Sequence, residues 1–466
     1  MDSHRRNPAK HLDRVLLSAF SVVLLFCGFY ANTWHVASQH QYDTFQHDTE
    51  SLVLGRLVQS RQSGIFSFGG LTGWGRSDES QASDWVGEQY QAFLNALTFS
   101  EYFPYLSQPG GQGMLFGVLD AVVPLSPQAA LRLFYALTCL LSALALTLVI
   151  LWFCLEFGLT VAAIALASGV LSQWLVMFGR NLWWSIWGFY LPMIAVQYFL
   201  RRQREPTHRH SISLGVVVFL SVLAKCFVNG YEYITTTLVM MVVPLVYYAV
   251  LDRWGMRRLG AGLLIAVVSS ILAVVVSASI LCVQIASVQG SLWDGVYHIL
   301  YSLGKRTYAD ASDFPAEYTA SLEASVIDVI LPYLKGLFIN LNNYVHTSSP
   351  IVSRFLLRIR YAYLIAVFLA ASGLVWRQAK ALSSAQQRSS MALVAATWFS
   401  ILAPLSWFVI FKAHSSIHTH MNFIVWQMPF TLFGFAVLGL LARGFARDLI
   451  RRVRHPSPSV SPNAQP

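Results

Sequence analysis

The chain has 466 residues, of which 55% are hydrophobic and only 12% are charged, and its mean hydropathy is +0.52. Soluble domains carry about 25% charged residues, so this composition excludes an ordinary soluble protein. Apolar runs of about 20 residues recur along the chain, and each can cross a hydrocarbon core of about 30 Å. The runs are continuously apolar rather than alternating, which disfavours a β-barrel. We therefore expect an all-α integral membrane protein.

The net charge of +10 is distributed in a way that indicates membrane orientation, so we expect no nucleic-acid partner. Residues 1–13 form a basic tail before the first apolar span, 14–34. Positive charge at that place favours a cytoplasmic N-terminus. The loop that follows, 35–128, carries nine acidic residues and only three arginines. Because this loop reverses the sign of the tail, we expect it to be extracytoplasmic.

This first outer loop should contain helices of its own. Residues 48–62 have the spacing of an amphipathic helix, with Leu52, Leu54, Leu57 and Val58 on the apolar side. Glycines then predict an irregular segment, and a second helix is expected over about 83–99. The run 114–125 is too short to span a membrane, and we expect it at the interface.

The rest of the chain predicts nine further spans and a second large outer loop, 285–360, with an amphipathic helix near 320–340. The predicted spans are 129–154, 160–178, 182–200, 212–226, 234–250, 260–284, 361–376, 391–411 and 423–442. Ten spans place both termini in the cytoplasm, and nearly every short loop then predicted inside is rich in Arg and Lys. We expect one membrane domain, 14–450, in the cytoplasmic (inner) membrane, followed by a disordered tail, 451–466.

Polar residues at the outer ends of the spans converge in this topology, and they are the candidate site. Ionisable groups at membrane level are costly and usually face a cavity. The candidates are Asp43, Asp48, Glu50, Arg180, Asn181, Lys225, Asn229, Glu232, Lys412, His414, His418 and His420. A carboxylate among them could accept a proton from a nucleophile, and the cations could hold a phosphate leaving group.

Structural roles compete with each of these assignments. Asp48 and Glu50 also fit acids that complement a helix N-terminus, and Lys225 also fits a lysine that snorkels to the interface. The aromatic run Trp183, Trp184 and Trp187 fits an interfacial belt as well as a sugar or lipid contact.

The histidine-rich loop is the most distinctive isolated pattern. His414 and His418 are four residues apart, so a helix would place both imidazoles on one face, and His420 follows closely. That spacing suits a divalent metal completed by an acid of the first loop. A hydrogen-bonding cluster at the interface is the alternative, and a third is that one histidine, such as His414, binds the lipid phosphate.

The order of features resembles the GT-C superfamily of membrane glycosyltransferases over about residues 14–200. The resemblance rests on a basic tail and first helix, then Asp48-Thr49-Glu50 in a long outer loop, then a helix ending in SRQSG. The segment SQPGGQGMLFGVLDAVVPLSPQAALRLFYAL, with Arg132 near the start of the second span, resembles the family's entry to that helix. The segment LASGVLSQWLVMFGRNLWW resembles its turn between the third and fourth spans.

This resemblance implies an enzyme that moves a hexosyl or pentosyl group from a polyprenyl phosphate to an extracytoplasmic acceptor. The acceptor would be a glycolipid, a polysaccharide of the cell envelope or a protein. Asp48 matches the family's catalytic acid, with Glu50 second and Asp43 in reserve. By position, Arg180, Lys225, Lys412 and His414 would bind the donor phosphate, and His418 and His420 would serve a metal if one is used. A transporter or flippase of lipid-linked precursors, and a non-catalytic relative, remain alternatives.

Overall fold

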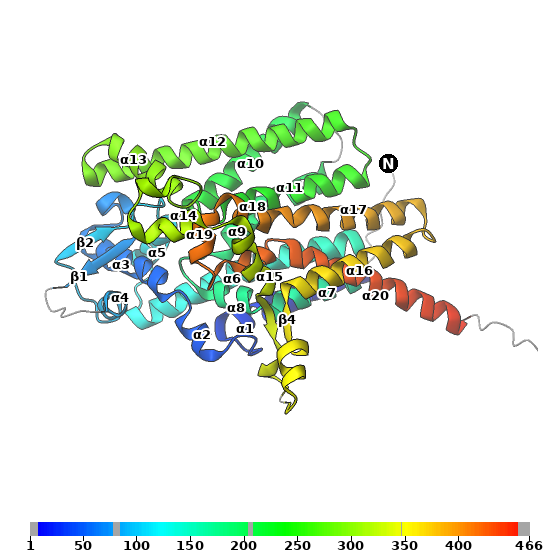
Figure 1. Ribbon diagram of the computed structural model, residues 1–466. Coiled ribbons are helices and arrows are strands. Elements are labelled where there is room, and N and C mark those ends of the chain that lie inside the picture. Colours follow the sequence, from blue (N-terminus) through cyan, green and yellow to red (C-terminus); the bar gives the residue numbers. More distant parts are fainter. Residues whose placement is uncertain (1–7, 78–83, 204–207, 346, 455–466) are drawn as a thin grey trace, which may run out of the picture.

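The computed structural model describes residues 8–77, 84–203, 208–345 and 347–454, and the protein is an elongated helical bundle with two small two-stranded sheets (Figure 1). The outer parts of both predicted tails, 1–7 and 455–466, lie outside the described residues, as does part of the predicted basic loop, 204–207.

The helices of the bundle are α1 (Pro8–Ala31), α6 (Pro127–Phe157), α7 (Leu159–Leu171), α8 (Gln173–Arg180), α9 (Ile186–Arg202), α10 (His208–Asn229), α11 (Ile234–Leu251), α12 (Met256–Gln289), α16 (Tyr361–Ala379), α17 (Ser384–Ser400), α18 (Leu402–Ile410) and α20 (Phe430–Arg454). The connecting elements are α2 (Gln39–Thr44), α3 (His47–Ser63), β1 (Gly73–Arg76), α4 (Trp85–Leu94), β2 (Glu101–Pro104), α5 (Gly111–Val122), α13 (Leu292–Gly304), α14 (Thr319–Glu323), α15 (Val326–Lys335), β3 (Leu337–Asn340), β4 (Arg358–Arg360) and α19 (Lys412–Ile417). Short 3-10 turns join several of them.

Among the described residues, eight helices are long and apolar enough to cross a membrane, or nine if one bent pair counts as a span. The eight coincide with eight of the ten predicted spans, so the fold is an all-α, multi-pass membrane protein. The predicted span 182–200 corresponds to α9, whose 17 residues are at the lower limit for crossing a bilayer. The predicted last span begins later than expected, because residues 422–427 form a 3-10 turn.

The predicted continuous span 160–178 is broken into α7 and α8, which are bent by 68°. Ser172 lies between them in an extended conformation, and its hydroxyl accepts a hydrogen bond from the backbone N–H of Leu175. A serine that caps a new helix competes with continuation of the old one. The chain therefore turns at Ser172, although its hydropathy is that of a single span.

The helix predicted over 48–62 is present as α3, but its amphipathic character is wrong. Residues on every side of α3 are buried, because α4, α5 and β1 enclose it. Its arginine Arg56 is fully buried and donates to the carbonyl oxygens of Gly64 and Ser67. The hydrophobic pattern within residues 48–62 cannot reveal this enclosure, because the residues that bury α3 lie outside that window.

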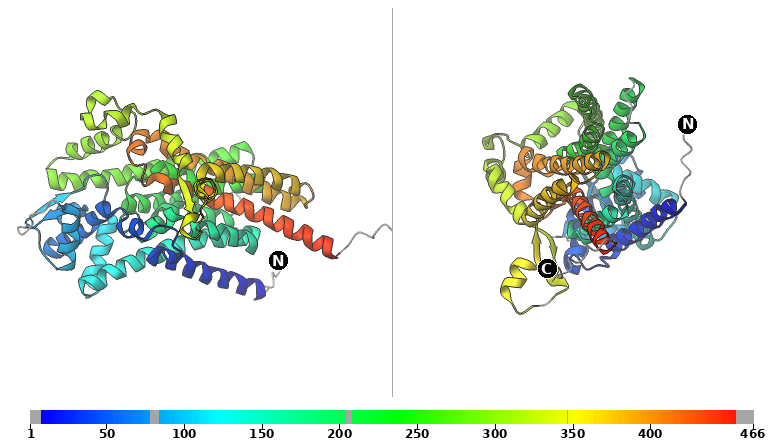
Figure 2. Two further views of the ribbon diagram at one scale, coloured as in Figure 1. Left: turned by 60° about the horizontal axis from the view of Figure 1, so that its bottom comes forward. Right: turned by 90° about the vertical axis from the view of Figure 1, so that its right-hand side faces the viewer.

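The remaining helices of the two loops are shorter than predicted. The helix predicted over 83–99 ends at Leu94, and strand β2 pairs antiparallel with β1 shortly after it. The helix predicted near 320–340 is two helices, α14 and α15, separated by an extended Ala324. The segment between β3 and β4 extends sideways from the bundle (Figure 2).

The elements of the first loop and α13 gather at one end of the bundle, which we call the site end (Figure 1). The N-terminal end of α1 and the C-terminal end of α20 both lie at the opposite end of the bundle. A main core of aromatic and aliphatic side chains runs through the bundle and includes Trp152, Trp407 and Trp426, beside a small separate cluster of Leu71, Leu281 and Ile285. This rigid core fixes the positions of the turns at the site end.

Candidate functional site

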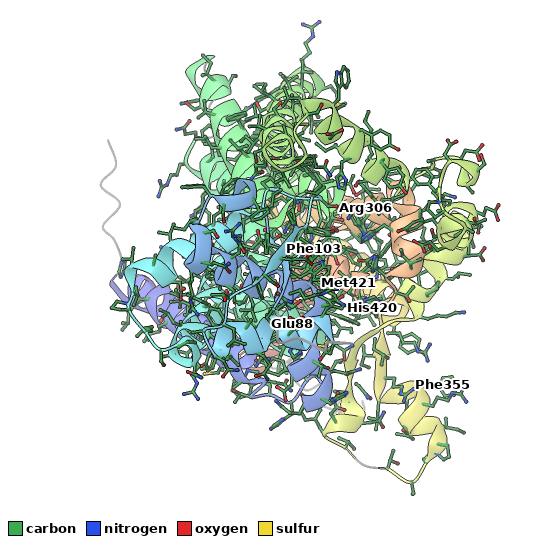
Figure 3. The ribbon with its side chains drawn as sticks, turned by 90° about the vertical axis from the view of Figure 1, so that its left-hand side faces the viewer. Glu88, Phe103, Arg306, Phe355, His420 and Met421 are labelled. Atoms are coloured by element: carbon green, nitrogen blue, oxygen red, sulfur yellow. The ribbon has the colours of Figure 1, made fainter. Side chains whose placement is uncertain are left out.

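A polar cavity of about 290 Å³ lies at the site end. Its wall contains five predicted residues, which are Asp48, Glu232, His414, His418 and His420. It also contains eight others with polar or aromatic side chains, which are Gln46, Thr49, Tyr105, Trp183, Trp184, Lys305, Arg306 and Tyr318. They come from α3, the chain after β2, the turns before α9 and α11, the chain after α13, and α19 with the loop that follows it. Figure 3 looks onto this end, where Arg306, Met421 and His420 lie near its centre.

Asp48 presents an exposed carboxylate to this cavity from the first turn of α3. Within the described part of the chain its side chain has no hydrogen-bond or ion-pair partner. The next residue, Thr49, accepts a hydrogen bond from the indole N–H of Trp184 at 3.1 Å, which fixes the start of α3 against the cavity wall. A free carboxylate on a polar cavity is available to accept a proton from a bound ligand.

Glu50 and Asp43 are placed elsewhere. Glu50 is buried, and its carboxylate accepts hydrogen bonds from the hydroxyls of Tyr90 and Tyr135 at 2.7 and 2.6 Å and from the N–H of Leu182 at 3.0 Å. Asp43 is exposed on α2 and accepts from Gln39. Glu50 therefore joins α3 to three other segments, and of Asp43, Asp48 and Glu50, the acids predicted to be catalytic, only Asp48 lines the cavity.

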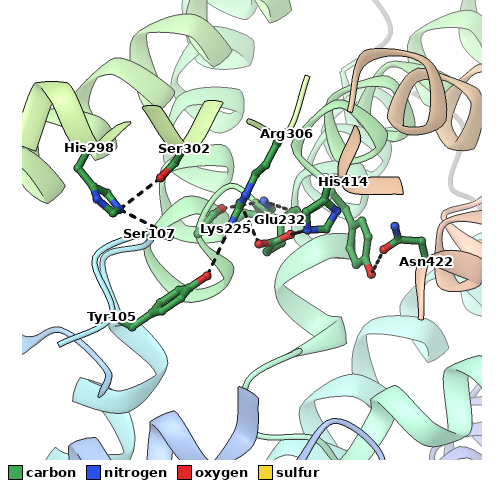
Figure 4. A network of polar contacts seen from close by, with 11 residues as sticks. Tyr105, Ser107, Lys225, Glu232, His298, Ser302, Arg306, His414 and Asn422 are labelled. Atoms are coloured by element: carbon green, nitrogen blue, oxygen red, sulfur yellow. Dashed lines mark hydrogen bonds and ion pairs between the residues drawn. The ribbon is translucent and has the colours of Figure 1, made fainter. Parts of the chain in front are cut away.

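An ion-pair network forms the opposite wall (Figure 4). The guanidinium of Arg306 donates from Nη1 to Glu232 Oε1 at 3.1 Å and from Nη2 to the hydroxyl of Tyr105 at 3.4 Å. The other carboxylate oxygen of Glu232 lies 3.8 Å from Nε2 of His414. Burial alone would lower the pKa of Arg306, but the nearby Glu232 and Tyr105 outweigh it and raise that pKa above its usual value. Arg306 is therefore a permanent cation of the cavity wall.

The turn between α10 and α11 is built to hold Glu232 in place. Lys225 is fully buried, and its ammonium donates to the carbonyl oxygens of Gly230 and Glu232 at 2.8 and 2.6 Å. Tyr233 has a φ of 51° and donates its hydroxyl hydrogen to Asn422 at 3.0 Å. A left-handed backbone in a buried aromatic residue costs about 1–3 kcal/mol and tends to occur at functional sites. These contacts make Lys225 a positioning residue for Glu232.

The other predicted cations do not line the cavity. Lys412 donates to the carbonyl oxygens of Leu322 and Ala324 at 2.6 and 2.9 Å, so it holds the end of α14. The guanidinium of Arg180 lies over the rings of Tyr42 and Tyr135. The amides of Asn181 and Asn229 donate to the backbone carbonyl oxygens of Phe45 and Ser185 respectively.

The three histidines of this loop form a cluster of tilted rings. The ring centroids of His414 and His418 are 4.2 Å apart, and those of His418 and His420 are 5.6 Å apart. Burial lowers the pKa of His414 well below its usual value, and the nearby His418 and Arg306 lower it further. Burial also lowers the pKa of His418, although Glu232 acts in the opposite direction.

These histidines do not fit the divalent metal suggested by their spacing. Within residues 8–77, 84–203, 208–345 and 347–454, no group of three or more His, Cys, Asp or Glu side chains is arranged to hold a metal ion. The cations Lys305 and Arg306 face the same cavity, and their charge would oppose a dication. The donor set suits hydrogen bonding to an uncharged polar group or to an anion.

Sequence reasoning missed Lys305 and Arg306. They follow α13, inside the second large loop and away from the ends of the predicted spans. The sequence does contain one signal for them. Lys and Arg are usually more frequent in cytoplasmic loops of membrane proteins, so two adjacent cations in a predicted outer loop are unusual.

A second, apolar cavity of about 190 Å³ adjoins the polar one and shares Arg306 with it. Its apolar lining includes Leu281, Ile299, Leu303 and Phe411, and the imidazole of His298 also lines it. A ligand with one charged and one hydrocarbon part could therefore place its charge at Arg306 and occupy both cavities.

Comparison of the chain with known protein families, curated sequences and solved structures finds no match.

Proposed function

We propose that the protein is a membrane glycosyltransferase that moves a sugar from a polyprenyl phosphate to an acceptor at the extracytoplasmic side of the cytoplasmic membrane. The observation that carries the proposal is the pair of adjoining cavities. One is polar and lined by an unpaired carboxylate, Asp48. The other is apolar, and Arg306 belongs to both. A lipid-linked sugar phosphate has the same sequence of parts, because a sugar, a phosphate and a hydrocarbon chain follow one another.

Asp48 is the general base in this proposal. Its carboxylate takes the proton of the acceptor hydroxyl, while the acceptor oxygen forms a bond to the anomeric carbon of the sugar. The bond between that carbon and the phosphate oxygen breaks, and its electron pair leaves with the polyprenyl phosphate. Attack from the side opposite the phosphate inverts the anomeric configuration. General-base assistance of this kind contributes about 10²- to 10⁴-fold to a rate.

Arg306 and Lys305 hold the phosphate as negative charge develops on it. The guanidinium is already fixed by Glu232 and Tyr105, so little reorganisation is needed when the phosphate binds. In this version of the proposal they replace Arg180, Lys225 and Lys412, whose side chains are directed to carbonyl oxygens or aromatic rings. The neutral imidazoles of His414 and His418, with the indoles of Trp183 and Trp184, would contact the sugar.

The substitution Asp48→Asn tests the proposal. Purified protein in liposomes would be incubated with a panel of polyprenyl-phosphate sugars, and released polyprenyl phosphate and glycosylated product would be measured. We expect Asp48→Asn to lower product formation at least about 100-fold, with donor binding retained. Asp43→Asn is the matched control, because Asp43 is an exposed acid nearby that does not line the cavity. Equal activity of both variants would remove Asp48 from the role of base.

The bent pair α7–α8 favours a second candidate, transport of a lipid-linked precursor. Discontinuous helices are typical of transporters, and α7 and α8 are bent by 68° relative to each other. The same liposomes distinguish the two functions. Movement of labelled lipid across the bilayer without a glycosidic product would support transport.

A further inference from the structure

A narrow arm projects from the bundle between α15 and α16. Strands β3 and β4 form its base, with Leu337 opposite Arg360 and Asn340 opposite Arg358. Residues 341–345 and 347–357 belong to the outer part, and Figure 3 shows Phe355 there, well apart from the cavity residues. The base is anchored, because the carbonyl oxygen of Leu337 accepts hydrogen bonds from Gln173 and Trp174 at 3.1 and 2.8 Å.

The outer part of the arm is both apolar and basic. Five large apolar or aromatic side chains are exposed there, namely Tyr344, Val345, Ile351, Phe355 and Leu356. Ile351 is 70% exposed and Leu356 is 64% exposed, values that in water would leave much apolar surface uncovered. Arg354 and Arg358 are exposed beside them, and the sequence from 336 to 360 contains no acidic residue.

The arm lies level with the ends of two candidate spans. It leads directly into α16, whose span begins at Tyr361. Its other side is attached to the chain just after α1. The amide of Asn343 donates to the carbonyl oxygen of His35 at 3.3 Å, and the hydroxyl of Tyr344 donates to that of Trp34. The arm runs sideways from the bundle axis in Figure 1 and in the right-hand view of Figure 2, so it extends parallel to the membrane surface.

We propose that this arm inserts into the phospholipid headgroup layer at the site end of the bundle. The apolar side chains reach the boundary between headgroups and acyl chains, while Arg354 and Arg358 bind the phosphates of anionic lipids. Side chains of these two kinds together are the usual composition of segments that lie in an interface. The arm would fix the position of β3 and α15 relative to the membrane. This proposal is independent of the transferase activity, because it assigns a lipid surface to a part of the chain outside both cavities.

Photocrosslinking tests the insertion directly. Benzoylphenylalanine would replace Phe355 in the full chain, in liposomes of phosphatidylcholine and phosphatidylglycerol. The same residue at Ala316 is the control, because Ala316 is exposed in the loop before α14 and is not part of the arm. After irradiation, lipid adducts would be counted by mass spectrometry. We expect several-fold more lipid adduct at 355 than at 316, and preferential capture of phosphatidylglycerol.

The double variant Arg354→Gln/Arg358→Gln tests the charge. It should remove the preference for phosphatidylglycerol while adducts at 355 persist, since the apolar contacts remain. Gel filtration and circular dichroism establish that each variant is folded. Equal lipid capture at 355 and 316 would overturn the proposal. Crosslinks from 355 to a second copy of the chain, in place of lipid, would overturn it too, because the arm would then be a contact between proteins.

Discussion

Arg306→Gln is the most informative perturbation of the site, because one side chain connects the carboxylate of Glu232, the hydroxyl of Tyr105 and both cavities. The Glu232 side chain is only 10% exposed, so removing the guanidinium leaves a poorly solvated charge. Breaking one side of a buried ion pair costs about 3–5 kcal/mol. In the double variant Arg306→Gln/Glu232→Gln that charge is absent, and most of the lost stability should return.

The assay is reversible unfolding in mixed detergent micelles, followed by fluorescence, for the wild type, both single variants and the double variant. Arg61→Gln is the control. Arg61 also pairs with an acid, Asp120, at 2.6 Å, but the arginine is 29% exposed. We expect this control to cost about 1–2 kcal/mol, from a surface ion pair and a contact over the ring of Phe93. If Arg306→Gln costs no more than Arg61→Gln, the assignment of a buried ion pair is refuted.

The same variants test the role of Arg306 in binding. Hydrogen bonds to charged groups contribute about 1.5–3 kcal/mol, which corresponds to about 10- to 150-fold in affinity. We therefore expect KM for a polyprenyl-phosphate sugar to rise by that factor in Arg306→Gln and to stay unchanged in Arg61→Gln. Arg306→Lys should restore only part of the affinity, because an ammonium cannot contact Glu232 and Tyr105 with the same planar geometry. An unchanged KM in Arg306→Gln would show that the phosphate binds elsewhere.

Three further predictions concern the neighbours of the cavity. Glu50→Ala should lower the free energy of unfolding by at least about 1–3 kcal/mol, because three buried donors lose their acceptor; stability equal to wild type in the same assay would contradict the structural role of Glu50. Lys225→Met should destabilise by a similar amount and lower kcat without changing the fold, because Glu232 loses its support; full kcat would show that Lys225 does not position it. Acidification should destabilise the protein as pH falls below about 6.5, the usual histidine value, because the unfolded chain then binds protons that buried His414 and His418 do not. His414→Gln should flatten that dependence in unfolding measured across pH, and an unaltered slope would exclude His414 as its source.

Much of the membrane architecture could be predicted because hydropathy depends only on residues that are neighbours in the sequence. A run of about 20 apolar residues prefers hydrocarbon to water whatever surrounds it, and eight predicted spans coincide with the eight candidate helices. The bend at Ser172 was missed, since a single capping hydroxyl changes the backbone without changing hydropathy. The enclosure of α3 was missed for a different reason, because the residues that bury it come from α4, α5 and β1.

The site was predicted in outline only. Asp48 and Glu50 are two positions apart on α3 and have the same chemistry, so sequence alone could not separate an exposed carboxylate from one that accepts three hydrogen bonds. Lys225 was noticed as a charge near a span end, yet the turn that it supports becomes visible only when Gly230 and Glu232 are placed around it. Arg306 carries no local signature beyond its charge.

The sequence by itself determined that the chain enters a membrane as helices, and it marked a few polar segments between them. Partition between water and lipid is a sum over neighbouring residues, so it can be read along the chain. Only the tertiary structure decided which polar side chains line a cavity and which are bound within the protein. That distinction depends on hydrogen-bond partners and burial supplied from distant segments, as the different positions of Asp48, Glu50 and Arg306 illustrate.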